Sequence, residues 1–143
     1  MLWKALAEEI PGIDAVSLRD RDEGEVKKVG PNLEDNDYTT VPGFRPLKWR
    51  RRHIESYLVV PRAMAAAAET PVADIVATLR DDYGLHIGEN YWHSETISTY
   101  LELRGKELFA RLRLSAQGVA KQLEPSEICD DLKALVAILA ASP

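Results

Sequence analysis

A chain of 143 residues with 45% hydrophobic and 29% charged residues has the composition of one soluble globular domain, which excludes the disordered and fibrous classes. With 18 basic and 23 acidic residues the net charge is −5, so any contact with nucleic acid or an anionic membrane must come from a local basic patch. The single cysteine, Cys129, excludes an internal disulfide and is typical of a reducing cytoplasm. No apolar run approaches a membrane span, and no signal-peptide pattern opens the chain. We therefore expect a cytoplasmic protein, with no membrane partner, that folds as one domain over 1–143.

The first third of the chain holds the strand-like segments. Apolar residues at helical spacing over 2–10, followed by Pro-Gly, predict a short first helix. Segment 13–18 has the pattern of a buried strand, and 44–49 predicts a second strand that Pro46 confines to an edge or a short piece. Between them, 23–43 is polar and rich in Gly and Pro, which predicts a long, mobile loop.

From residue 51 onward the apolar residues recur at helical spacing almost to the end. The predicted helical segments, including the first, are 2–10, 54–58, 61–68, 71–83, 92–105 with its apolar face continued over 108–112, 115–123 and 127–139. Seven helical segments and two short strands indicate an α+β fold that is predominantly helical. It divides into a partial α/β element over 1–50 and a helical region over 51–143.

An acidic pair stands directly after the first predicted strand. Asp20 and Asp22 are two positions apart, and open α/β sheets carry their active sites at that end of the strands. Two carboxylates so placed can share one Mg²⁺ or Mn²⁺, and such a metal can activate water and screen a phosphodiester. The alternative is that the charges of 19–23 form a solvated turn in which they partly cancel.

A basic run over 45–53 is the second candidate feature. Its five basic residues, which predict contacts with a nucleic-acid backbone, are Arg45, Lys48, Arg50, Arg51 and Arg52. Glu55 follows within one helical turn, and it becomes a third carboxylate beside Asp20 and Asp22 if the two strands are parallel neighbours. The alternatives are a basic surface turn, arginines that pair with the acidic loop 34–37, and an ordinary salt bridge from Glu55 to Arg51 or Arg52.

Other chemistry is not indicated by the sequence. His53, His86 and His93 lack the spacing of metal ligands, and Cys129 is expected as a small core residue. There is no Gly-x-Ser-x-Gly elbow and no phosphate-binding loop, so no nucleotide cofactor is expected to bind this chain.

The order of these motifs resembles the C-terminal part of bacterial ATPases of the overcoming-lysogenization-defect (OLD) type, which join an ABC-like ATPase to a TOPRIM-like nuclease domain. The resemblance covers roughly residues 13–140. It rests on the aspartate pair after a strand and on the stretch Arg-His-Ile-Glu-Ser-Tyr-Leu at 52–58, before Pro61. It rests further on Gly-Lys-Glu-Leu at 105–108 and on the acidic start of the last helix at 127–131.

The resemblance implies that Asp20 and Asp22 match the family's metal-binding aspartates and that Glu55 matches its helix-start glutamate. A TOPRIM domain also has an earlier glutamate, at the end of its first strand, that serves as general acid/base. No residue here matches it, because Glu8 and Glu9 lie on the predicted first helix. The resemblance therefore implies a truncated nuclease element. If active it would be a divalent-metal-dependent DNA endonuclease, and on its own it should have little or no activity.

Two classes of function remain open. The first is this nuclease element, with Mg²⁺ or Mn²⁺ as cofactor and with DNA and a separate ATPase subunit as partners. The second is a non-catalytic helical module whose apolar faces serve docking to a protein or self-association as a homodimer. Because two strands make a marginal sheet, a strand added by another subunit is expected in either case.

Overall fold

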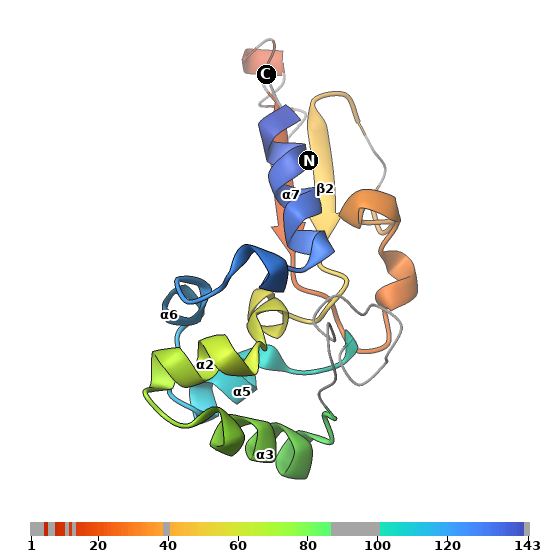
Figure 1. Ribbon diagram of the computed structural model, residues 1–143. Coiled ribbons are helices and arrows are strands. Elements are labelled where there is room, and N and C mark those ends of the chain that lie inside the picture. Colours follow the sequence, from red (N-terminus) through yellow and green to blue (C-terminus); the bar gives the residue numbers. More distant parts are fainter. Residues whose placement is uncertain are drawn as a thin grey trace.

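The computed structural model describes residues 5, 8–10, 12, 14–38, 41–86 and 101–141. Only residues 5 and 8–10 of the helix predicted over 2–10 are among them, and most of the segment predicted over 92–105 lies outside them. The chain is an α+β protein, mostly helical, with a small parallel sheet of two strands, β1 (Ala15–Arg19) and β2 (Phe44–Lys48). Both strands point toward the helical half of the molecule, so their carboxyl ends face it (Figure 1). No helix of the described residues has the length and apolarity that a membrane crossing requires.

The two predicted strands are confirmed as parallel neighbours. Their register runs from Ala15 opposite Phe44 to Arg19 opposite Lys48. Beyond β2 the ladder continues, because the N–H of Trp49 donates to the C=O of Arg19 at 3.0 Å. Pro46 lies on an edge strand, as predicted, and its C=O accepts the N–H of Asp35 at 3.0 Å. A residue without an N–H is tolerated there because its side of β2 faces no further strand.

The segment between the strands is folded onto the outer edge of β2. It contains two 3₁₀ turns, η1 (Val26–Lys28) and η2 (Pro31–Leu33), and an isolated bridge joins Glu34 to Leu47. Leu33 is fully buried, and Asp35 is almost so. The described part of this segment is therefore a packed cover, which corrects the prediction of a mobile loop. A few apolar residues anchor it, and they are too few to give a periodic signal.

The helical half is built from η3 (Ile54–Leu58), α2 (Pro61–Ala68), α3 (Val72–Tyr83), α5 (Gly105–Arg111) and α6 (Ala116–Ala120). Proline opens α2 and Gly84, in the left-handed conformation, ends α3, as the sequence pattern predicted. The buried core that these elements share consists of Leu58, Val59, Val60, Ala63, Met64, Ala65, Ile75, Leu79, Leu85, Leu103, Leu108, Phe109 and Val119.

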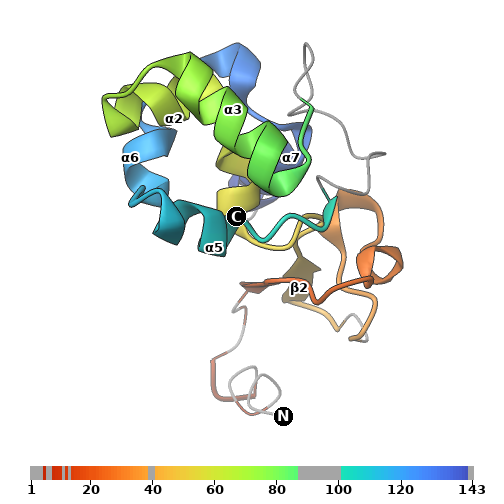
Figure 2. The same ribbon diagram turned by 90° about the horizontal axis from the view of Figure 1, so that it is seen from below.

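The last helix joins the two halves. After the 3₁₀ turn η5 (Pro125–Glu127), α7 (Asp130–Ala141) runs back along the strands (Figures 1 and 2). A second buried cluster lies between them and consists of Val29, Leu33, Leu47, Trp49, Tyr57, Cys129 and Ile138. The hydroxyl of buried Tyr57 donates to Asp131 at 2.6 Å and accepts the N–H groups of residues 50 and 51. This polar link fixes the start of α7 to the chain that leaves β2.

Candidate functional site

The carboxyl ends of the two strands meet, as the sequence predicted for parallel neighbours. The N–H of Arg21 donates to the C=O of Arg52 at 3.2 Å, and Arg52 Nε donates back to the C=O of Arg21 at 3.1 Å. The turn that carries Asp20 and Asp22 therefore lies beside the segment that leads into η3. Both aspartates are exposed to solvent.

A buried arginine holds this turn in place. Arg21 is 1% exposed and lies between the two candidate aspartates. Its Nε donates to the C=O of Arg50 at 2.6 Å, and its Nη1 contacts the C=O of Asp22 at 2.8 Å and Glu102 Oε1 at 2.9 Å. Its Nη2 donates to the C=O of Leu101. Sequence reasoning missed this role, because Arg21 lies in a run of charges that is typical of a solvated turn.

A lysine from the helical half reaches Asp20. Lys106 Nζ lies 3.6 Å from Asp20 Oδ2, and the N–H of Lys106 donates to His53 Nδ1 at 3.4 Å. We call Asp20, His53 and Lys106 the strand-end cluster. Partial burial lowers the pKa of His53; the charge of Asp20 opposes this, whereas those of Lys106 and Arg52 add to it. Because Nδ1 accepts a hydrogen bond, the proton of the neutral imidazole is assigned to Nε2.

A glycine allows Lys106 to come this close. At Gly105 an added Cβ would lie 2.4 Å from the backbone N of Ser56 and 2.7 Å from its Oγ. The first turn of α5 therefore rests directly on η3, and the N–H of Gly105 donates to Ser56 Oγ at 3.3 Å. Sequence reasoning noticed Gly105 and Lys106 only through the family resemblance, because a contact between residues so far apart leaves no periodic signal.

The described residues do not form a complete metal site. Nowhere within them are three His, Cys, Asp or Glu side chains grouped so that they could hold a metal ion. Glu55 is half-buried in η3 and is near enough to His53 to affect its charge, but it does not join Asp20 and Asp22 in such a group. Two carboxylates can still supply part of a Mg²⁺ shell, since this ion commonly keeps waters and takes phosphate oxygens as ligands.

Much of the basic run 45–53 is used inside the fold. The Lys48 side chain is 3% exposed and pairs with Asp37 at 2.7 Å and Asp35 at 3.5 Å, a pairing with the acidic loop that the alternative had assigned to arginines of the run. The same lysine is the main reason that the pKa of Asp37 is lowered. Arg51 is buried over the ring of Tyr57, with 5.0 Å between its Cζ and the ring centre.

The other three cations of the run differ in exposure. Arg50 is half-buried, 3.5 Å from Asp131, and half-buried Arg52 bonds to the Arg21 carbonyl. Arg45 is exposed. A phosphate backbone could therefore reach Arg45 freely, Arg50 and Arg52 in part, and the two buried cations of the run not at all.

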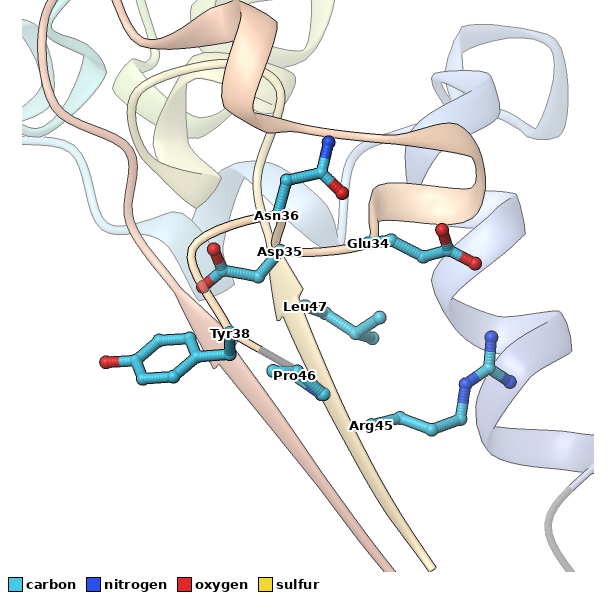
Figure 3. A pocket seen from close by; sticks show the side chains of 7 residues that line it. All are labelled: Glu34, Asp35, Asn36, Tyr38, Arg45, Pro46 and Leu47. Atoms are coloured by element: carbon cyan, nitrogen blue, oxygen red, sulfur yellow. The ribbon is translucent and has the colours of Figure 1, made fainter. Parts of the chain in front are cut away.

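A small hollow of about 80 Å³ lies at the outer edge of β2. Its lining residues are Glu34, Asp35, Asn36, Tyr38, Arg45, Pro46 and Leu47. Figure 3 shows that Asp35 and Tyr38 point to one side and Glu34 and Arg45 to the other. Because the polar groups diverge, this hollow does not present a set of donors and acceptors to one ligand.

A larger apolar groove of about 430 Å³ lies between η3, α6 and the start of α7. It is lined by Ile54, Leu58, Ala116, Gln117, Ala120, Leu123, Ile128 and Leu132. Further along α7, Val136 and Leu139 are 65% and 52% exposed. Apolar surface of this kind is typical of contacts with another polypeptide rather than of chemistry.

The chain was compared with known protein families, curated proteins and solved structures. No family model matches the chain, and no curated protein or solved structure matches it.

Proposed function

We propose that the chain is the metal- and DNA-directed part of a TOPRIM-like nuclease unit of the OLD type, with an incomplete active site and little or no activity on its own. One observation carries the proposal. The parallel pairing of β1 and β2 sets the aspartate turn beside the segment 52–58, and these are two of the four stretches on which the family resemblance rests.

Each residue of this strand end has a role under the proposal. Asp20 and Asp22 would hold Mg²⁺ or Mn²⁺, which when bound activates water and screens the phosphodiester charge. Lys106 offers a cation beside Asp20, and the Nε2–H of His53 offers a hydrogen-bond donor. Glu55 contributes to the electrostatics of His53. Turnover requires a further carboxylate, because the described residues group no third one with the aspartates.

The edge of β1 that faces away from β2 favours the addition of a strand from another polypeptide. The N–H of Ala15 bonds to Gly43 and the C=O of Arg19 to Trp49, so in a parallel ladder Val16 and Leu18 direct their backbone groups away from β2. No described residue pairs with that edge of β1. A strand from another subunit, such as an ATPase partner, would extend the sheet there and end next to Asp20.

The test is Mn²⁺ binding by titration calorimetry, combined with cleavage of plasmid DNA. We expect weak, millimolar binding that disappears in the double variant Asp20→Asn/Asp22→Asn. A matched control is Asp74→Asn, which removes an exposed aspartate on α3 and should leave binding unchanged. Any metal-dependent nicking should likewise vanish in the double variant alone. Equal Mn²⁺ binding by parent and double variant, or no binding by either, contradicts the proposal.

A second candidate function is self-association, which the apolar groove and the exposed apolar side of α7 favour. A second copy of the chain that packs on this surface would bury Val136 and Leu139, which are otherwise exposed. We expect a dimer in sedimentation experiments that Val136→Glu dissociates and that Ala137→Glu, an exposed neighbour on α7, leaves intact. The dimer should persist in Asp20→Asn/Asp22→Asn. A monomeric parent protein would rule this candidate out.

A further inference from the structure

The highest density of exposed positive charge lies outside the run that the sequence singled out. Segment 104–121 carries five basic residues and a single acidic one, Glu107, in a chain whose net charge is −5. All five are exposed: Arg104, Lys106, Arg111, Arg113 and Lys121. In the run 45–53, by contrast, two of the five cations suggested as phosphate contacts are buried.

This basic segment starts at the candidate site and leads away from it. Lys106 is part of the strand-end cluster, 3.6 Å from Asp20. From there α5 and α6 follow one another on the same side of the helical half in both views (Figures 1 and 2). A polyanion bound along them would therefore pass the aspartate turn.

Several of these cations are available to a phosphate. Arg104 pairs with Glu107 at 2.8 Å and Arg111 with Asp82 at 2.6 Å, but all four side chains are 40% or more exposed. Exposed ion pairs of this kind are weak, so a phosphate can replace the carboxylate as the partner of each arginine. Arg113 and Lys121 form no ion pair with any other residue in the described part of the chain.

Arg113 occupies a position that favours glycine. It follows the last turn of α5 with φ of 55°, in the left-handed region. Its N–H bonds to Ala110, and that of Leu114 bonds to Phe109, which is the hydrogen-bond pattern of a Schellman helix end. A side chain at such a position lowers the stability of the fold. Its presence, exposed and without an ionic partner, therefore points to a role outside the fold.

We propose that the exposed cations of segment 104–121, which contains α5 and α6, form the surface that contacts the phosphate backbone of DNA. The inference rests on the proposed function for the identity of the partner. The contacts would be non-specific in sequence, because charged side chains at phosphates position a duplex without reading its bases.

The experiment measures binding of a short fluorescent DNA duplex by anisotropy over a series of salt concentrations. For Arg113→Gly/Lys121→Gln we expect weaker binding and a slope of log K against log salt that is smaller by about two, roughly 0.9 for each lost phosphate contact. The single variant Arg113→Gly should melt no lower than the parent, so its loss of binding cannot come from unfolding.

Two controls complete the experiment. Glu69 at the end of α2 has the same left-handed conformation as Arg113. Glu69→Gly should therefore gain stability without losing DNA affinity. Asp20→Asn/Asp22→Asn should lose no DNA affinity, because it only removes negative charge beside Lys106, and this result separates the basic surface from the metal site. No binding by the parent at low salt, or an unchanged slope in Arg113→Gly/Lys121→Gln, would overturn the inference. An unchanged slope would not contradict the proposed metal site.

Discussion

Replacement of Gly105 by alanine is expected to destabilise the protein strongly, by about 3 kcal/mol or more, which is the upper part of the range for overpacked sites. The new Cβ would meet the backbone N of Ser56 at 2.4 Å and the carbonyl carbon of Glu55 at 2.8 Å. Backbone atoms cannot rotate away as a side chain can, so α5 must lift from η3. The midpoint of urea unfolding should fall at an unchanged m value.

The same change should affect the site. Because the N–H of Lys106 bonds to His53, a shift of α5 separates Lys106 from His53 and Asp20. Gly118→Ala is the matched control, since the atom nearest to its added Cβ is the Oγ of the exposed Ser115, which can move. We expect it to change stability by no more than about 1 kcal/mol. A Gly105→Ala protein with the parent's midpoint would show that α5 does not rest on η3 as described.

Replacement of Arg21 by methionine is the second change with a large expected effect. The guanidinium donates to the carbonyl groups of Asp22, Arg50 and Leu101 and to the carboxylate of Glu102. Methionine fills a similar volume but leaves the buried carbonyl of Leu101 and three partly buried acceptors without this donor, at a cost of about 3 kcal/mol, the lower end of the range for broken buried pairs. Differential scanning calorimetry on parent and variant measures the loss.

Arg19→Met is the control for this substitution. Arg19 stands two residues earlier, its side chain is 42% exposed, and its partners Asp35 and Asp37 keep Lys48 as a second cation. We expect a smaller loss, of about 1 kcal/mol, because Arg19 itself is exposed and the buried carboxylate of Asp35 keeps Lys48 as its cation. Equal losses for the two variants would mean that Arg21 does not organise the strand ends.

The local elements of this fold were predictable because they depend on near neighbours in the chain. The helix predicted over 71–83 is found as Val72–Tyr83, one residue shorter because Pro71 is extended and forms the N-cap. Its apolar period, the proline at its start and the glycine at its end are all near neighbours in the chain. The two strands were likewise recognisable from short apolar runs. The cover over β2 was not, because Leu33 is anchored by residues of β2 and α7 that lie far away in the sequence.

In the candidate site, too, only the features that depend on near neighbours in the chain were predictable. The positions of Asp20, Asp22 and the segment 52–58 followed from the sequence, because a residue that ends a predicted strand is placed by that strand. The proposed DNA-contact residues did not follow, because clustered cations in a sequence give no information on burial. Lys48 and Arg51 are among the most buried polar residues of the described chain, whereas Arg113 is exposed.

The sequence by itself determined the elements, the α+β class and the place of the aspartate pair at a strand end, since each of these depends on periodicity or on neighbouring residues. Only the tertiary structure decided which charges face inward. Arg21 is satisfied by acceptors from residues 22, 50, 101 and 102, and Lys106 reaches Asp20 only because Gly105 lets two backbones touch. Such contacts join segments that meet only in the folded chain, and no spacing in the sequence encodes them.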